Sequence, residues 1–160
     1  MPPMTQPGGG GGNASTVVNT ALANDSCDGR TIVGLAGEAW NAHDHPIVYF
    51  KAADSRWWKA KADAYATTRG LIGIVVDSAA KNAGDPIVVL LPGPDNIIRC
   101  DTHFALTINA QYFLSAATGG ALTAADTPPA VSVQQVRRMG YGYAATIFLF
   151  DADGTVMENL

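Results

Sequence analysis

Short apolar runs alternate with turn-forming residues along most of the chain from Thr31 onwards. Each run is rich in β-branched and aromatic residues and is bounded by Gly, Pro, Asn or Asp, a pattern typical of short strands joined by tight turns. A helix fits only residues 54–66 and, weakly, residues 76–82, and the pair Trp57 and Trp58 suits a strand equally well. We therefore predict a mostly β fold, with strands at residues 31–35, 47–51, 57–61, 71–76, 87–91, 96–100, 111–115, 131–137 and 144–151.

Three stretches share a diffuse repeat that predicts β-hairpins. They begin at Asn41, Asn82 and Asn109, each followed by alanine, and each continues with a strand, a turn and a second strand. Their spacing is unequal, so they do not form a solenoid of fixed period. Pro46 and Pro86 stand at the start of a strand, where a residue that cannot donate to a sheet ladder is tolerated. The repeat favours a compact antiparallel β-barrel or sandwich built from hairpins.

The first fifteen residues differ from the rest because they lack apolar periodicity. They contain three prolines and a run of glycine from Gly8 to Gly12, which predicts a flexible, extended N-terminal arm. Fixing such a backbone costs about 1–2 kcal/mol per residue, so a partner surface would have to offset the ordering. We divide the chain into this arm, residues 1–15, and a single β-rich domain, residues 16–160.

Charged side chains make up only 15% of the chain, and the net charge is −4. A nucleic-acid binder or a ligand of acidic membranes needs a clustered basic surface, which this balance does not favour. Arg137 and Arg138 are adjacent, so on a strand they would point to opposite faces and make no basic patch. A surface with few charges is typical of a contact with another protein, although an Ala/Gly-rich composition also produces it.

No apolar run reaches the roughly 18–20 residues that a membrane-spanning helix requires. The N-terminus also lacks a charged segment followed by an apolar one, so we expect no signal peptide. Cys27 and Cys100 are far apart, without CxxC spacing, and we interpret them as buried free thiols. These features predict a protein that is made in a cytoplasm.

Titratable residues in a catalytic arrangement are scarce. His43 and His45 flank Asp44, and histidines two apart on a strand face the same side and could bind a metal. A third ligand is not evident, so we interpret these residues as a polar turn before the strand that follows. His103 lies in another turn, without the pattern of a nucleophile and base around it. We therefore predict no enzyme, no cofactor and no metal site.

Three segments of the chain follow one another in a familiar order. The first is residues 36–39 with the strand at residues 47–50 and residues 58–60, and the second is residues 70–76 with residues 83–89. The third is the stretch at residues 112–123 with residues 140–144. In this succession, over roughly residues 35–150, the chain resembles small tailed-phage head-decoration (capsid cement) proteins and related modules of phage fibres. The basic residues before Gly140 and the glycine-rich arm depart from the common pattern and leave cement and fibre roles both open.

The resemblance implies a structural protein on the capsid surface of a bacteriophage virion, assembled in the host cytoplasm. Such a protein would be a homo-oligomer, trimer or dimer, that bridges subunits of the major capsid protein, with neither nucleic acid nor membrane as a partner. The alternative is a fibre or tail accessory that binds a host receptor or glycan, with Trp57 and Trp58 stacking on sugar rings. Burial of those two residues would exclude this alternative.

The residues expected to touch a partner lie in two segments, one flexible and one stiff. The loop at residues 126–130 contains two consecutive prolines and is expected to be exposed. The arm is the other candidate, because it would gain order on a neighbouring subunit. The expected interface residues are Pro2, Pro3, Gly8, Gly10, Gly12, Asn13, Pro128 and Pro129.

Overall fold

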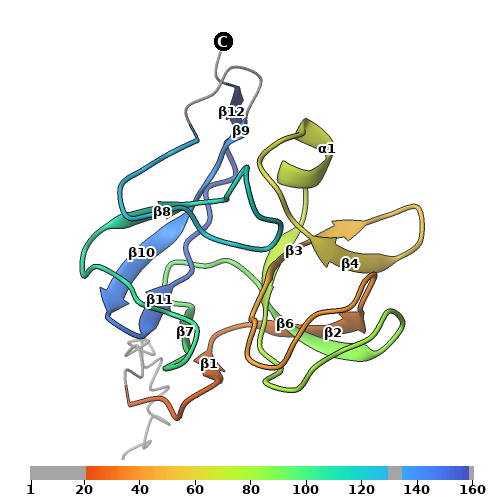
Figure 1. Ribbon diagram of the computed structural model, residues 1–160, viewed down its shortest axis with the longest axis horizontal. Coiled ribbons are helices and arrows are strands. Elements are labelled where there is room, and N and C mark those ends of the chain that lie inside the picture. Colours follow the sequence, from red (N-terminus) through yellow and green to blue (C-terminus); the bar gives the residue numbers. More distant parts are fainter. Residues whose placement is uncertain (1–20, 130–134, 159–160) are drawn as a thin grey trace, which may run out of the picture.

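The computed structural model describes residues 21–129 and 135–158, which form two five-stranded antiparallel sheets packed against each other (Figure 1). Neither sheet closes into a barrel, so the predicted mostly β fold is confirmed in its sandwich form. The elements are β1 (Ser26–Asp28), β2 (Thr31–Leu35), β3 (Ile47–Lys51), β4 (Arg56–Lys59), α1 (Tyr65–Thr68), β5 (Ile72–Val75), β6 (Pro86–Leu90), β7 (Ile97–Arg99), β8 (Gln111–Phe113), β9 (Gln135–Val136), β10 (Arg138–Ala144), β11 (Ile147–Leu149) and β12 (Met157–Glu158).

The chain forms β1 of one sheet, then all five strands of the other sheet, and then the remaining strands of the first sheet. The first sheet has the order β1-β7-β11-β10-β8, and the second has the order β2-β6-β5-β3-β4 (Figure 1). A short pair, β12-β9, stands beyond them. Because β1 precedes the whole second sheet but pairs with β7, the segment just before β1 lies beside the segment just after β7. No helix in the described residues is long and apolar enough to span a membrane.

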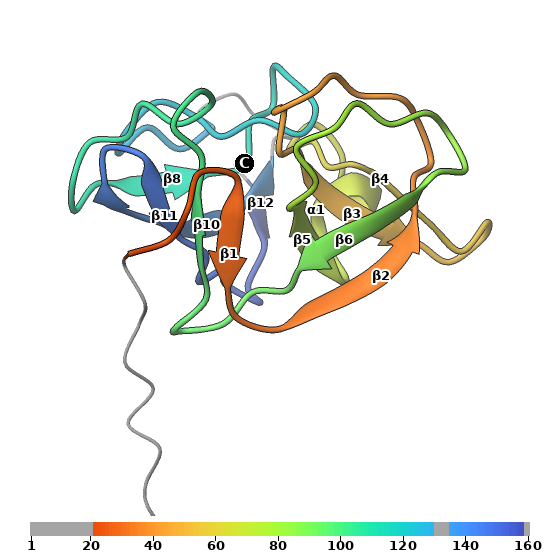
Figure 2. The same cartoon turned by 90° about the horizontal axis from the view of Figure 1, so that it is seen from below.

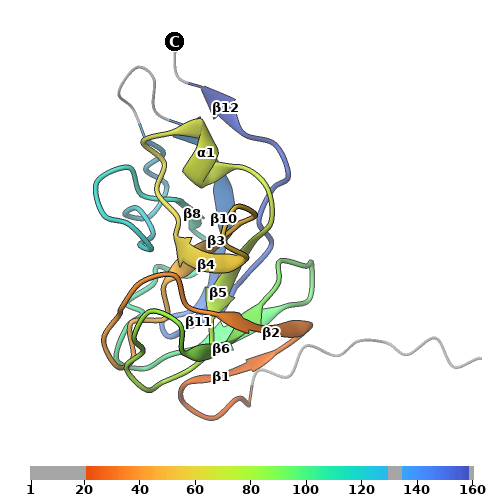
Figure 3. The same cartoon turned by 90° about the vertical axis from the view of Figure 1, so that its right-hand side faces the viewer.

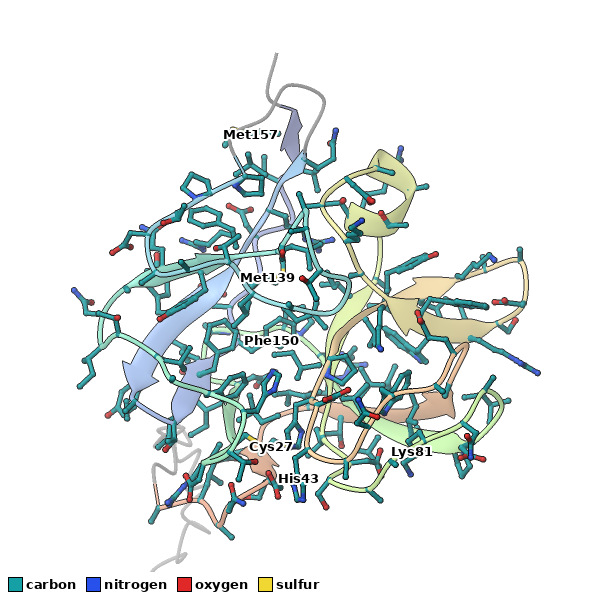
Figure 4. All side chains as sticks on the ribbon, in the orientation of Figure 1. Cys27, His43, Lys81, Met139, Phe150 and Met157 are labelled. Atoms are coloured by element: carbon teal, nitrogen blue, oxygen red, sulfur yellow. The ribbon has the colours of Figure 1, made fainter. Side chains whose placement is uncertain are left out.

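The main core lies between the two sheets. The second sheet contributes Ile47, Ile74 and Leu90, and the first contributes Tyr112 and Phe148, whose rings meet edge to face at 6.0 Å. Figure 4 shows Met139 and Phe150 in the interior between the sheets. Alternation along each strand turns these side chains to one face, and their burial is the main force that holds the sheets together.

A second cluster occupies the opposite face of the second sheet, around Trp57. That sheet is curled, so the segment that follows β2 reaches β4, and Gly37 N–H donates to Trp57 O at 2.6 Å. Gly34 allows this approach, because a Cβ there would lie 2.4 Å from Trp57 Nε1. Trp57 is consequently only 1% exposed. The predicted stacking of Trp57 on a sugar ring is therefore wrong, since its ring is a core element.

Most strands lie within two residues of their predicted positions, and the exceptions are informative. The predicted strand at residues 144–151 contains β11 and only the last residue of β10, because a turn after Ala144 separates the two, and residues 138–143 of β10 were not predicted as strand. Only residues 135–136 of the predicted strand at 131–137 form a described strand, and residues 131–134 lie outside the described part. The helix considered at 54–66 is instead β4 followed by the single turn α1, and residues 76–82 contain no helix.

The three predicted hairpins have different outcomes. The first is confirmed, because β3 and β4 pair antiparallel with Tyr49 opposite Trp58. The second is wrong, because β6 and β7 belong to different sheets. Two prolines in the intervening loop, Pro92 and Pro94, cannot donate to a ladder, and the loop carries the chain across the sandwich. The third pairs only through the bridge between Leu114 and Leu122.

Candidate functional site

Four polar side chains meet at the junction between the two sheets: Asp25, His43, His45 and Cys100. Asp25 directly precedes β1 and Cys100 directly follows β7, so both stand at the end of one pair of strands. His43 and His45 belong to the loop that leads into β3 of the other sheet. Figure 4 shows His43 beside this end of β1, near Cys27.

Strand register explains why Asp25 and Cys100 come together. Cys27 is paired with Ile98, and the antiparallel register continued outwards by two residues puts position 25 opposite position 100. Asp25 stands in the turn before β1, with a φ of 54°, so the pairing brings the two positions together while the bend at Asp25 sets the direction of its side chain. The pairing of β1 with β7 thus brings the Asp25 carboxylate and the Cys100 thiol to the same end of the two strands.

The distances in the cluster are those of direct contacts. Asp25 Oδ2 lies 2.8 Å from His43 Nδ1, and Asp25 Oδ1 lies 3.0 Å from His45 Nε2. The other ring nitrogen of His45, Nδ1, lies 3.0 Å from Val75 O on β5. One potential ligand atom each from Asp25, His45 and Cys100 lies within 4.8 Å of the others. His45 therefore links the second sheet to the edge of the first.

Neighbouring polar contacts hold Asp25 in place. The Arg99 guanidinium donates to Leu22 O at 2.8 Å and also to both carboxylate oxygens of Asp101. Asp101 N–H donates to the side-chain oxygen of Asn24 at 2.6 Å. Two residues just before Asp25 are thereby attached to the end of β7 and the residue after Cys100, and such outer contacts are what orient a binding residue.

Three residues of the cluster have an unusual backbone conformation. Asp25, His43 and His45 have φ values of 54°, 60° and 39°, in the left-handed region. Asp and His tolerate this region better than most residues, but each such position still costs about 1 kcal/mol. The turn before His45 is closed by Asn41 N–H, which donates to Asp44 Oδ2 at 3.0 Å. These bends aim both imidazoles at a single carboxylate.

The electrostatics of the cluster favour an ionised Asp25. Burial by itself would raise the pKa of Asp25, but contacts with Cys100, His45 and His43 outweigh it and lower the pKa below its usual value. The pKa of Cys100 is raised, first by burial and also by the Asp25 carboxylate. The site is therefore a negative centre faced by an uncharged thiol and two imidazoles.

A cavity of about 310 Å³ adjoins the cluster and shares His45 as part of its lining. His103 lines the same cavity, with its ring centroid 6.3 Å from that of His45 in an edge-on arrangement. Burial, followed by the neighbouring His45, lowers the pKa of His103, so its ring stays neutral at neutral pH. The remaining lining is mainly apolar and includes Phe104, Leu106 and Leu122. The space would suit a small, largely apolar group.

The predicted interface residues are only partly within the described chain. Pro2, Pro3, Gly8, Gly10, Gly12 and Asn13 lie outside the described residues. Pro128 is exposed as expected, whereas Pro129 is buried, so the expectation of an exposed loop fails at that residue. The two cysteines are free thiols; Cys100 is fully buried, while Cys27 is only half-buried.

The sequence prediction located half of the cluster and missed the other half. The sequence shows His43 and His45 as a possible metal-binding pair but gives no sign of a third ligand. The third and fourth members, Asp25 and Cys100, are distant in sequence and become neighbours only through the β1–β7 register. A local signal exists in the Cys-x-x-His spacing of Cys100 and His103, although the structure groups Cys100 with His45 instead.

No protein-family model, curated protein or solved structure matches this chain.

Proposed function

We propose that this protein is a structural component of a tailed-phage virion that decorates the capsid exterior and stabilises it by bridging major capsid protein subunits. The order of motifs along the chain supports this role, as does the shortage of surface charge. The observation that carries the proposal is an exposed edge of the second sheet, formed by Thr31, Val33 and Leu35 of β2 and named here the β2 edge, which is unpaired along Thr31 and Val33.

The hydrogen-bonding pattern of β2 defines which groups face outwards. Leu91 N–H donates to Arg30 O at 2.9 Å, and Ala36 N–H donates to Asp85 O at 2.9 Å. In an antiparallel ladder, residues that bond to the neighbour alternate with residues that bond away from it. Because residues 30 and 36 bond towards β6 and its flanks, residues 31, 33 and 35 direct their N–H and C=O groups away from the sheet. In the described part of the chain, β4 meets this side of β2 only at the bridge between Ala36 and Trp57, so no strand pairs with Thr31 or Val33.

The side chains of the β2 edge are exposed to solvent. Val33 is 76% exposed and Leu35 is 43% exposed. Figure 2 shows β2 along the rim of the second sheet, with β6 on one side only. An apolar edge strand is a ready template for pairing with another chain unless something covers it. Addition of a strand from a partner would satisfy both the backbone groups and the apolar side chains.

A capsid is the kind of partner that suits a small contact of this type. A lattice presents many equivalent sites, and an oligomeric module gains avidity from binding several of them, so each contact can be weak. The fibre or tail alternative depended on Trp57 and Trp58 as a stacking platform. Trp57 is buried and so cannot stack on a sugar ring. Trp58 Nε1–H donates to Asp54 Oδ2 at 3.0 Å. We therefore favour the capsid role.

The proposal is tested by sedimenting the purified protein with undecorated capsids assembled from the major capsid protein of the same genome. The intact protein should bind saturably in a fixed ratio to capsid subunits. Val33→Lys should weaken binding about tenfold or more, because it places a charge in an apolar contact. Met157→Lys is the matched control, since Met157 is also apolar and 61% exposed but lies on β12 at the opposite end of the molecule (Figure 3).

A version that lacks residues 1–13 is measured in parallel to learn whether the arm contributes. Weaker binding by that version would make the arm a second contact. Failure of the intact protein to bind would overturn the capsid role, and equal loss of binding in Val33→Lys and Met157→Lys would overturn the assignment of the β2 edge.

A further inference from the structure

His45 lies between two groups that both accept hydrogen bonds. A backbone carbonyl has no proton to donate, so the contact of Val75 O with Nδ1 at 3.0 Å places the ring hydrogen on Nδ1. In a neutral imidazole, the lone pair is then on Nε2, which faces Asp25 Oδ1 at 3.0 Å. Two electron-rich atoms at this distance need a positive charge between or beside them. That charge is either a proton between the two atoms or a metal ion.

The Cys100 thiol favours the metal ion. A proton shared by His45 and Asp25 would need no third group, yet Cys100 Sγ completes a set of three potential ligand atoms within 4.8 Å of one another. Cys100 is fully buried and His45 is 2% exposed. Carboxylate, imidazole and thiolate together are ligands of borderline-soft divalent ions rather than of Mg²⁺ or Ca²⁺, which take oxygen.

We propose that Asp25, His45 and Cys100 bind a divalent cation of the zinc class at the junction of the two sheets. Bonds of about 2.0–2.3 Å place the ligand atoms of a tetrahedral zinc site roughly 3.3–3.7 Å apart. Asp25 Oδ1 and His45 Nε2, now 3.0 Å apart, would therefore separate slightly to admit the ion, with Cys100 Sγ adjusting to reach it. Zn²⁺ with one carboxylate, one thiolate and one neutral imidazole has no net charge, which suits a buried position. Binding releases the thiol proton, and a fourth position remains for a water molecule.

Contacts outside the three ligands fit this assignment. The carbonyl that holds His45 Nδ1 is the usual outer partner of a metal-binding histidine, because it fixes the ring and exposes Nε2 to the ion. His43 contacts the second oxygen of Asp25 at 2.8 Å and so leaves Oδ1 for the ion. His43 is about half exposed, with 48% of its side chain accessible, so it stands at the outer side of the site.

The cation would act as a clip between segments that are far apart in the sequence. Asp25 and Cys100 flank β1 and β7 of the first sheet, whereas His45 precedes β3 of the second. Binding of one ion would therefore hold the two sheets together at their junction. Free energy of metal binding of this kind adds directly to the free energy of folding.

Cobalt(II) is the probe, because it takes zinc sites and reports its ligands by absorption. The full-length protein, freed of metal with a chelator, is titrated with Co²⁺. We expect one equivalent to bind, with visible bands of tetrahedral cobalt and a thiolate-to-cobalt charge-transfer band in the near ultraviolet, and Zn²⁺ to displace it. Cys100→Ser should abolish the charge-transfer band and weaken binding about tenfold or more. Cys27→Ser is the matched control and should retain the band.

Two further measurements keep the test decisive if Cys100→Ser folds poorly. Asp25→Asn retains the thiol and should still weaken Co²⁺ binding, while Zn²⁺ should raise the melting temperature of the intact protein but not of Asp25→Asn. Absence of the charge-transfer band in the intact protein would overturn the proposal and leave a shared proton between His45 and Asp25. A band that persists in Cys100→Ser, or disappears in Cys27→Ser, would likewise overturn it.

Discussion

At the scale of single residues, the structure depends on glycines that stand where a side chain has no room. Gly140 on β10 is the strictest case, because its φ is +150° and a Cβ there would lie 1.9 Å from Leu149 O. The register between β8 and β10 shifts at this position, between Arg138 and Gly140. Gly140 therefore lets a bulge form while β11 passes close to the backbone.

Replacement of Gly140 by alanine should disrupt the pairing of β10 with β11. We expect Gly140→Ala to lower the free energy of unfolding by about 3 kcal/mol or more, as strain at a special φ combined with a backbone clash usually does. Gly154→Ala is the control, because nothing lies within 4 Å of the added Cβ; its effect should stay within about 0.5 kcal/mol. Urea unfolding of both variants measures the difference, and equal stabilities would contradict the description of β10.

At the scale of elements, a buried arginine connects segments that pairing alone would leave apart. Arg137 lies between β9 and β10 and is 5% exposed. Its guanidinium donates to the carbonyls of Thr68, Gly70 and Asp153. It thereby joins the end of α1 to the segment that leads into β12. Burial lowers the pKa of Arg137, although a guanidinium remains charged at any physiological pH.

Loss of the Arg137 side chain should loosen this corner of the molecule. We expect Arg137→Met to lower the free energy of unfolding by roughly 2–3 kcal/mol, because buried carbonyls lose their donors. Arg138→Met is the matched control on the next residue, whose side chain is partly exposed and makes a long ion pair with Asp151, at 3.5 Å, and a hydrogen bond to the Tyr141 hydroxyl. Its effect should be about 1 kcal/mol or less. If thermal unfolding showed a larger loss of stability in Arg138→Met than in Arg137→Met, the proposed role of Arg137 would be contradicted.

The same scale explains what the sequence could predict. Strand positions follow from local alternation, so β2 and β3 were predicted within their observed bounds. The assignment of β6 and β7 to different sheets depends on long-range pairing, which local pattern does not encode. The candidate site divides in the same way: His43 and His45 are visible as neighbours in the sequence, whereas Asp25 reaches Cys100 only through the register of β1 with β7.

At the scale of the whole molecule, two features of the sandwich serve different purposes. The junction cluster of Asp25, His45 and Cys100 lies inside, where the sheets meet, and bears on how firmly they are held. The β2 edge lies at the rim, with Val33 and Leu35 open to a partner. A module that is rigid within and open along one edge is suited to bridging the subunits of a larger assembly.

The central claim, that this protein decorates and stabilises a phage head, is tested most directly by the heat resistance of DNA-filled heads with and without it. Heads that lack the protein are saturated with purified chain, heated in steps, and assayed for release of DNA. We predict that the saturated heads release their DNA at a higher temperature, and that Val33→Lys, added at the same concentration, gives little of this protection. Release at the same temperature with and without bound protein would contradict a stabilising role.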